Sequence, residues 1–454
     1  MKIIAIIAVY LCCILMFFVK REYKIAILIL SSITFTLVSP PVPHYSAPSV
    51  LSLCFLISEI PHLVKLFRQS RKSIVWKITG IALLSIIITI LSSPHLSDNN
   101  VAYYYFQGEF LCKYLVLIYS FWSFRDVKSL KPTLKVTFWG LIVLTVFGIF
   151  NYLSKTAGFV NVMMAGVVSN LKGASGSDAG NYFTYSDRFR VQAMFTNPFD
   201  YGYICVLMLI LHLYGYTQRL EKLKTFVVVV ACTIFGIIFC GCRTILFCTL
   251  IGLSIYMLIA YKTQKKLKII LVTLFIIPIA YQTVPAVQEQ ADKMLSVFDK
   301  NSQVGGSSLE MRSIQYATVF FYISDDPWFG RGYGFFNQDL GWGEGIKVDE
   351  RLEGLEGVVM GLLLEHGIIG LILYLIYYLS IIVYFIRRRK ISKHLSALGV
   401  SIIAVYLSFA NMTGELLSVF PTLCCVGFVL KALNTEEKEL PMAIDNSLEL
   451  QKHS

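Results

Sequence analysis

The chain has 454 residues, of which 56% are hydrophobic and 15% are charged. Soluble domains carry about 25% charged residues, so this composition excludes an ordinary soluble protein. The apolar residues come in blocks close to bilayer length, without ten-residue alternation. This pattern predicts an all-α, polytopic transmembrane helical bundle of about 12–13 spans.

The net charge of +12 is distributed in a way that argues against a nucleic-acid partner. Lysine and arginine concentrate in short loops, which alternate along the chain with uncharged or mixed loops. This is the positive-inside pattern of membrane proteins, and it explains the charge without nucleic acid. The basic clusters occupy residues 20–24, 65–77, 125–135, 219–224, 262–268 and 387–393.

Thirteen apolar segments are candidate spans, and they divide the chain into six parts. Transmembrane helices are expected within 1–152, 198–286 and 357–432. Two long extracytoplasmic loops, 153–197 and 287–356, separate these groups, and the second is expected to contain short helices. The polar tail 433–454 is expected to be disordered and cytoplasmic. The spans are 3–19, 25–39, 47–64, 74–92, 106–124, 134–152, 198–216, 225–241, 243–260, 268–286, 357–386, 395–411 and 414–432.

The side on which the N-terminus lies depends on the first two spans. If all thirteen segments cross, the alternation of basic loops puts the N-terminus outside and the C-terminus inside. The first two spans are near the lower length limit for crossing, so a re-entrant hairpin is the alternative. The later topology is the same in both cases.

The first long loop ends in RFRVQAMFTNPFDYG, which places two arginines shortly before a helix start. Asn197 caps that helix, and Pro198 fits its first turn. The positive end of the helix dipole then faces outward, where it favours an anion, and Arg190 adds charge at the same edge. The alternative is that Arg188 and Arg190 only reach lipid headgroups at the interface.

Arg243 and Arg312 are two further cations expected on the outer side. Arg243 lies between two apolar segments in FCGCRTILFC, where the positive-inside pattern does not explain it and a charge needs a partner. A structural ion pair or a turn is the alternative for Arg243. Arg312 opens an apolar, helix-like stretch inside the second long loop.

A glycine-rich turn follows that stretch in DDPWFGRGYG. Asp326 precedes Pro327, which ends the helix-like stretch. Three glycines at alternate positions, with Gly332 at their centre, can bring backbone N–H groups close to a ligand. The motif is not a nucleotide loop, because it lacks GK[ST] and follows no strand, and a tight turn is the alternative. Trp328 and the other aromatic residues of the outer loops suit sugar rings, but they also suit an interfacial belt.

Candidate bases lie near the start of the span 357–386. Glu356 could accept a proton from a hydroxyl within reach, or it could simply complement the helix dipole. Glu365 and His366 lie deeper in the same span, where hydrogen bonds between helices and chemistry are both open. His44 and His95 are isolated loop histidines and are alternative bases.

No metal or other cofactor is expected. The sequence contains no H-E-x-x-H, no clustered His and Cys, and no paired DxD near a basic loop. Nearly all of the eleven cysteines lie inside apolar segments, where we expect them to be buried small hydrophobes.

Four fragments in order resemble the O-antigen ligase and polymerase superfamily of bacterial polysaccharide assembly. RVQAMFTNP is similar to the family's arginine followed by an Asn-Pro helix start, and GCRT is similar to its Ser-Arg turn, with Cys242 in place of serine. RSIQYATVFFYISDDPWFGRGYGFF is similar to its arginine, Asp-Pro and Gly-x-Gly stretch. LLLEHGIIGLILYL is similar to its Glu-x-Gly-Ile-Ile-Gly span. The resemblance covers residues 188–378.

One departure from the family pattern distinguishes its branches. The ligase branch carries a His-Asn shortly before the Glu-x-Gly, and this sequence has Glu356-Gly357 at that place. The resemblance therefore implies a Wzy-type polymerase of polysaccharide repeat units in the bacterial inner membrane. Its site would face the periplasm or exterior, and it would transfer glycan from undecaprenyl diphosphate to the non-reducing end of another lipid-linked repeat unit.

The resemblance also implies roles for particular residues in a metal-independent glycosyl transfer that uses no cofactor. Arg190 and Arg312 are the expected catalytic cations, and Glu356 is the expected base. The expected partners are an undecaprenyl-diphosphate-linked oligosaccharide and membrane lipid, and whether a chain-length co-polymerase binds is open. The expected substrate-binding residues are Arg188, Arg243, Asn197, Asp326, Gly332 and Trp328.

Three other functions stay open at this point. A ligase that transfers glycan to lipid A core or to a protein would share the arginines and differ only in its acceptor. A glycan flippase would make no bonds, and the long polar outer loops and an expected absence of charges in the early spans argue against it. A non-catalytic assembly subunit is not favoured by outward-facing arginines.

Overall fold

A computed structural model of the chain describes residues 2–34, 47–70, 73–156, 190–195, 197–264, 309–335, 349–352, 357–414 and 419–452, with a few isolated positions between them. Over these residues the protein is a bundle of helices without strands, as the sequence predicts. Seven of the described helices are long and apolar enough to cross a membrane. The protein is therefore a multi-pass membrane protein.

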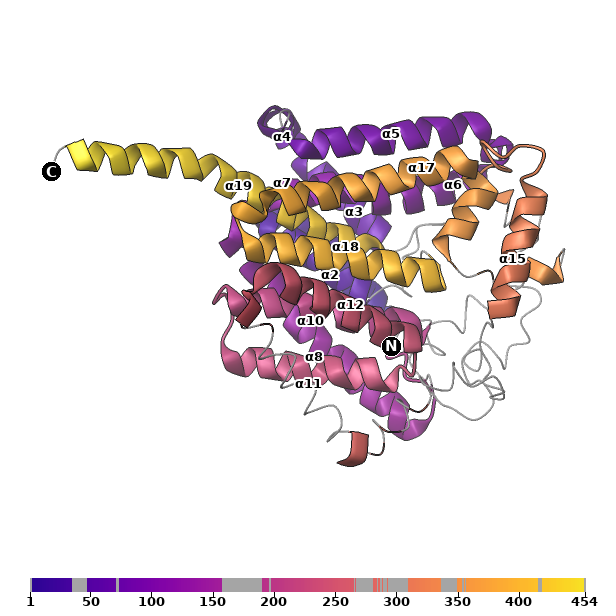
Figure 1. Cartoon of the computed structure of the whole chain (residues 1–454), viewed down its shortest axis with the longest axis horizontal. Coiled ribbons are helices and arrows are strands. Elements are labelled where there is room, and N and C mark those ends of the chain that lie inside the picture. Colours follow the sequence, from indigo (N-terminus) through magenta and orange to yellow (C-terminus); the bar gives the residue numbers. More distant parts are fainter. Residues whose placement is uncertain are drawn as a thin grey trace.

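The helices run roughly along one another (Figure 1). The first half contains α1 (Lys2–Phe18), α2 (Arg21–Thr34), α3 (Ala47–Glu59), α4 (Leu63–Ser70), α5 (Ile74–Ser92), α6 (Asn99–Tyr105), α7 (Leu115–Ser123) and α8 (Lys131–Ser154). The second half contains α10 (Pro198–Thr217), α11 (Leu223–Phe239), α12 (Arg243–Ala260), α15 (Leu309–Tyr322), α17 (Val358–Arg387), α18 (Lys393–Thr413) and α19 (Val419–Lys452). The helices α10, α18 and α19 are the most buried of the seven candidate spans. They are apolar around most of their circumference, which is the pattern of a central helix.

The basic loops gather at one end of the bundle. Arg125 pairs with Glu22 of α2 at 3.6 Å, and Arg388 pairs with Glu437 of α19 at 2.8 Å. The Thr435 hydroxyl donates a hydrogen bond to the Arg125 carbonyl oxygen at 2.9 Å. We call this the basic end, and it lies at the left of Figure 1.

The opposite end carries α15 and the start of α17, and we call it the loop end (Figure 1). The helices α12 and α18 pack antiparallel, because Tyr256 near the end of α12 contacts His394 at the start of α18, with 3.3 Å between Oη and Nδ1. The first residue of α12, Arg243, therefore lies at the loop end together with the last residues of α18.

The predicted span 106–124 differs from a regular helix. It begins at Asn99, and its middle turns, Phe106–Tyr114, are π-helical and are labelled η3. The wider turns carry Glu109 and Lys113, which form an ion pair at 3.1 Å. The expected absence of charges in the early spans is therefore wrong. Charged side chains are accepted here because they pair with each other inside the bundle.

The helix α17 contains a break at Gly367, where φ is 61° and ψ is −163°. A segment of the second long loop fills this break and exchanges backbone hydrogen bonds with it. The N–H groups of Arg331 and Gly332 donate to the Leu364 and Glu365 carbonyl oxygens at 2.8 and 3.0 Å. In return, the N–H groups of Ile368 and Ile369 donate to the Pro327 and Trp328 carbonyl oxygens at 2.9 and 3.1 Å.

This exchange explains the glycines on both sides of the break. Gly330, Gly332, Gly334 and Gly367 all have positive φ, a conformation that other residues rarely adopt. A Cβ at Gly330 would lie 2.7 Å from the Gly367 nitrogen, and one at Gly332 would lie 2.9 Å from the Ser93 Cα. The loop can therefore approach both α17 and the end of α5 only because these positions lack side chains.

The bounds of several predicted spans match the structure closely, and others lie outside what it describes. The predicted spans 74–92 and 243–260 are α5 and α12. Most of 268–286 lies outside the described residues, as do 157–189 of the first long loop and 336–348 of the second.

The C-terminal tail differs from the sequence expectation. The helix α19 continues to Lys452 and projects from the basic end (Figure 1), although composition predicts a disordered tail over 433–454. Residues 433–452 contain four glutamates, four leucines and two lysines, which all favour helix, and this propensity outweighs the polarity of the segment.

The break in α17 predicts a stability difference between two Gly→Ala variants of the same helix. Gly367→Ala would put a Cβ 2.5 Å from the Trp328 carbonyl oxygen at a positive φ, so it should destabilise the protein by at least about 2 kcal/mol. Gly361→Ala should be neutral or stabilise by about 0.5–1 kcal/mol, because no atom lies within 4 Å of its Cβ and alanine favours helix. Thermal unfolding of both purified variants measures this, and equal stabilities would contradict the role given to the break.

Candidate functional site

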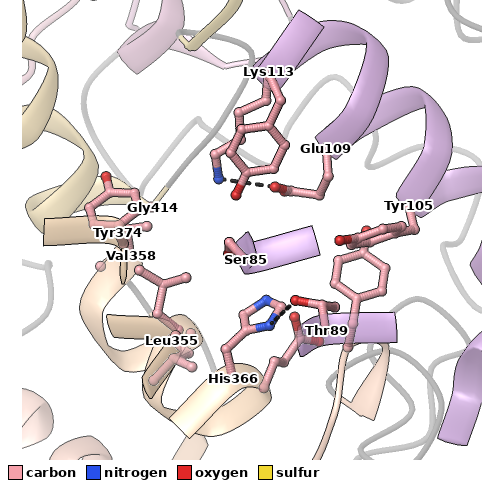
Figure 2. Close-up of a pocket in the computed structure, with 17 residues that line it drawn as sticks. Ser85, Thr89, Tyr105, Glu109, Lys113, Leu355, Val358, His366, Tyr374 and Gly414 are labelled. Carbon is pink, nitrogen blue, oxygen red and sulfur yellow. Dashed lines mark hydrogen bonds and ion pairs between the residues drawn. The ribbon is translucent and has the colours of Figure 1, made fainter. Parts of the chain in front are cut away.

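A cavity of about 320 Å³ lies at the loop end of the bundle, between α5, the α6–η3 segment, α17 and the end of α18. Its wall is unusually polar for the interior of an apolar bundle. Figure 2 shows Thr89, Glu109 and Lys113 directed toward a common space, with His366 opposite the ion pair. The chemically active side chains of the wall are Thr89, Tyr105, Glu109, Lys113, Glu365 and His366.

The Glu109–Lys113 ion pair forms one side of the cavity. The Lys113 side chain is only 4% exposed, and its Nζ lies 5.8 Å from the centre of the Tyr114 ring and 5.7 Å from that of Tyr374. Glu109 is 23% exposed, so its carboxylate borders the open space. A buried ion pair costs desolvation energy and rarely improves stability, so its presence in a cavity wall favours a functional role.

The broken part of α17 forms the opposite side. The Glu365 carboxylate accepts a hydrogen bond from the Gly334 N–H at 3.0 Å, which adds a side-chain contact to the backbone exchange at the break. His366 lies 3.2 Å from the Thr89 hydroxyl through Nδ1, and its ring lies 6.1 Å from that of Tyr333. Burial raises the pKa of the Tyr333 phenol, so this group stays protonated at neutral pH.

Arg312 lies beside this cavity. Its Nη2 donates a hydrogen bond to the Met412 carbonyl oxygen at 2.9 Å, in the last turn of α18. Gly414, which directly follows α18, and Gly357 at the start of α17 both line the cavity. A Cβ at Gly357 would lie 2.8 Å from the Asn411 carbonyl oxygen, so the two helix ends are in close contact. Arg312 therefore binds the helix end that closes one edge of the cavity.

Arg190 and Arg243 both lie at one turn of the loop end. The Val191 N–H donates to the Phe239 carbonyl oxygen at 3.0 Å, which attaches the end of the first long loop to α11. Gly241, between α11 and α12, has φ 64°, and a Cβ there would lie 3.3 Å from the Arg190 Cγ. Arg243 opens α12 two residues later.

The antiparallel packing of α12 on α18 relates this turn to Arg312. A Cβ at Gly252 would lie 2.5 Å from the Val405 side chain, so these residues are level with each other. Counting nine residues back along α12 and nine forward along α18 puts Arg243 level with Gly414. The structure thus brings Arg190, Arg243 and Arg312 to the same end of the bundle, around the end of α18.

Other predicted site residues have structural contacts. The Asn197 side chain accepts a hydrogen bond from the Asp200 N–H at 2.8 Å and donates one to its carboxylate at 2.9 Å, so it caps α10 as expected. Asp326 is exposed and accepts a hydrogen bond from the Phe329 N–H at 3.2 Å, and Trp328 is 58% exposed. The Gly332 N–H is already bonded to the Glu365 carbonyl oxygen, which favours the tight-turn interpretation over direct ligand binding.

Two predicted residues, Arg188 and Glu356, lie outside the described residues, and so does His44. His95 lies in the short helical turn Pro94–Ser97 after α5. Among the described residues, no group of three or more His, Cys, Asp or Glu side chains could hold a metal ion.

The Glu109–Lys113 pair and the Thr89–His366 contact are absent from the predictions made from sequence. The pair could have been predicted from the sequence, since Glu and Lys four residues apart in an apolar segment are expected to face each other on one side of a helix. The contact between Thr89 and His366 joins residues 277 positions apart, and nothing in a single sequence indicates it.

Comparison with known proteins gives one family. Residues 227–375 match the model of the O-antigen ligase family, Wzy_C. A search of curated proteins finds no match. The matched segment contains Arg243, Arg312, the glycine-rich loop and the break in α17, which are three of the four fragments on which the resemblance rests. The chain is therefore a multi-pass membrane protein, and its residues 227–375 are similar to the O-antigen ligase family.

Proposed function

We propose that this protein polymerises lipid-linked oligosaccharide repeat units of a bacterial surface polysaccharide at the outer face of the inner membrane. The anomeric carbon of a glycan leaves undecaprenyl diphosphate and forms a bond to a hydroxyl at the non-reducing end of a second repeat unit. The hydroxyl gives up its proton, and undecaprenyl diphosphate departs with the electron pair of the broken bond. The family match supports this class of reaction, since the matched family transfers glycans.

The arrangement of three arginines around the end of α18, beside a polar cavity, is the observation that carries the proposal. Arginine binds phosphate oxygens through two parallel N–H donors and does not lose its charge, so it suits a diphosphate leaving group. Arg190 and Arg243 share one turn, and Arg312 binds the last turn of α18. All three arginines lie at the loop end, opposite the basic loops. The positive-inside pattern assigns this loop end to the exterior.

In this proposal, the cavity of about 320 Å³ holds sugar next to the diphosphate site. Tyrosine rings give flat apolar contacts, while Glu109, Lys113 and Thr89 give hydrogen-bonding groups for hydroxyls. The charges of Glu109 and Lys113 offset each other, so the pair offers sugar hydroxyls both a hydrogen-bond acceptor and a donor.

Glu356 is the proposed base. It directly precedes Gly357, which lines the cavity, and the start of a helix favours its ionised form. The polymerase branch is preferred over the ligase branch because Glu356-Gly357 stands where ligases carry His-Asn. The ligase activity shares the diphosphate site and differs in its acceptor.

The role of Glu356 predicts the phenotype of Glu356→Gln, which keeps the size of the side chain but cannot take a proton. Transfer should fall by about 10²–10⁴-fold with donor binding unchanged. A strain that carries only this variant should display single repeat units on its surface, as gel analysis of the glycan would reveal. Long lipid-linked chains that fail to reach their acceptor would instead assign the ligase activity. Normal chains would remove Glu356 from the mechanism and make His366→Gln the next variant to test.

The arginines predict a second set of variants. Arg190→Ala and Arg312→Ala should each slow addition of repeat units by about 10²–10³-fold, because each removes a cation placed at the developing negative charge. Lysine at either position should restore little of the lost rate, since an ammonium group cannot bind two phosphate oxygens in the bidentate geometry of arginine. The rate is measured with purified protein and a lipid-diphosphate-linked repeat unit.

Arg351→Ala is the matched control for these variants. Arg351 is an exposed arginine of the same outer loop, paired with Asp349 at 2.8 Å, and its loss should leave the rate close to wild type. Unfolding temperatures show whether Arg312→Ala has only loosened α15 from α18. Wild-type rates in both alanine variants would rule out the phosphate role.

A further inference from the structure

A second cavity, of about 310 Å³, lies at the basic end, away from the site described above. Four cations line it: Arg21 at the start of α2, Lys65 in α4, Arg125 after α7, and Lys431 in α19. No acidic residue is among the described residues of its wall. Segments far apart in the sequence therefore bring positive charge to one hollow.

Two carboxylates near the cavity pair with cations of its wall. Glu59 pairs with Arg21 at 2.7 Å and with Lys24 at 2.7 Å, and Glu22 lies 3.6 Å from Arg125. Arg21 and Lys24 therefore share Glu59, while the cavity wall itself contributes four cations and, among its described residues, no carboxylate. The lining of the hollow is thus positive, and an anion is the ligand that this lining favours.

Aromatic side chains form the remaining wall. Phe121, Trp122 and Phe124 line the cavity at the end of α7, and the Lys431 Nζ lies 5.1 Å from the centre of the Phe121 ring. Aromatic residues beside lysine and arginine at the end of a spanning helix are typical of the depth of lipid headgroups.

The position of the short helix α4 also indicates that the cavity lies at the depth of the lipid headgroups. The helix lies across the end of the bundle next to α5 (Figure 1), and Phe67 packs on Trp76 of α5 with ring centres 4.8 Å apart. Its Val64 side chain is 66% exposed, while Leu66 is buried and lines the cavity. A helix with exposed apolar side chains and basic residues at this place fits the plane of the membrane interface.

We propose that this basic cavity binds the phosphate-bearing headgroup of an anionic phospholipid in the cytoplasmic leaflet. The four cations contact the phosphate, and exposed apolar side chains that lead to α4, such as Ile57 and Ile60, lie along the acyl chains. Basic pockets between spanning helices on the cytoplasmic side bind anionic headgroups for this reason. The site is independent of the reaction proposed for the loop end.

A binding measurement with matched variants tests this site. The full chain is purified in a neutral detergent, and native mass spectrometry follows retention of added phosphatidylglycerol against phosphatidylcholine. Wild-type protein should retain phosphatidylglycerol preferentially. Lys65→Gln/Arg125→Gln should weaken that retention by about tenfold or more, because two headgroup contacts are lost. Both side chains are exposed, so the fold should persist, and the unfolding temperature checks this.

Arg387→Gln/Arg389→Gln is the control. It removes two charges from exposed positions at the same end, outside the cavity, and should leave retention close to wild type. Equal loss in both double variants would mean that binding is diffuse and would overturn the proposal. So would wild-type protein without a preference for phosphatidylglycerol. Inorganic diphosphate that binds in place of the lipid and is lost in Lys65→Gln/Arg125→Gln would assign the cavity to a soluble anion instead.

Discussion

The exchange of backbone hydrogen bonds between the broken helix α17 and the glycine-rich loop is the interaction on which the loop end depends. Inside a membrane, every backbone N–H and carbonyl group must find a partner within the protein. A break at Gly367 would leave such groups exposed, and residues 327–332 satisfy them. The same loop contacts the end of α5, where the Tyr333 N–H donates to the Ser93 hydroxyl at 2.7 Å. Three elements are thereby held around one cavity.

This arrangement gives a physical reason for the motifs on which the resemblance to the family rests. The Glu-x-Gly motif supplies a carboxylate that anchors the loop and a glycine that opens the helix. The Gly-x-Gly-x-Gly stretch supplies the only residue type that can pass so close to α17 and α5. These motifs build the frame of the cavity, and the arginines at this end are the groups to which we assign the chemistry in the proposed function. The frame explains why glycines alternate in the loop.

The two ends of the bundle differ in the use of positive charge. At the basic end, lysines and arginines are numerous, lie in short loops and fit a surface of anionic lipid. At the loop end, Arg190, Arg243 and Arg312 each lie at a helix terminus or beside one. An excess of positive charge in the loops of one side sets the orientation of a protein in the membrane. Single guanidinium groups at fixed positions instead suit recognition of one diphosphate.

The sequence was sufficient for the spans with the clearest apolar blocks, since α5 and α12 have the predicted bounds. Hydropathy does not reveal the break in α17, because the span stays strongly apolar on average despite Glu365 and His366, and only the distant loop explains the break. The sequence indicates each of the three arginines as a candidate. Their common position at the end of α18 depends on helix packing, which cannot be predicted from one sequence. Glu109 and Lys113 were overlooked because the segment reads as an ordinary span, while its π-helical turns make the pair part of a cavity wall.

Sidedness tests the central claim most directly, because the arginines can meet a lipid diphosphate at the outer face of the inner membrane only if the loop end faces outward. A cysteine in place of Trp328, which is 58% exposed at the loop end, should react with a membrane-impermeant maleimide in intact cells with an opened outer membrane. A cysteine in place of Arg389, exposed at the basic end, should react only after the inner membrane is permeabilised. The unsubstituted protein, whose eleven cysteines are buried or half-buried, gives the background. Labelling of Arg389→Cys but not Trp328→Cys in intact cells would contradict the account.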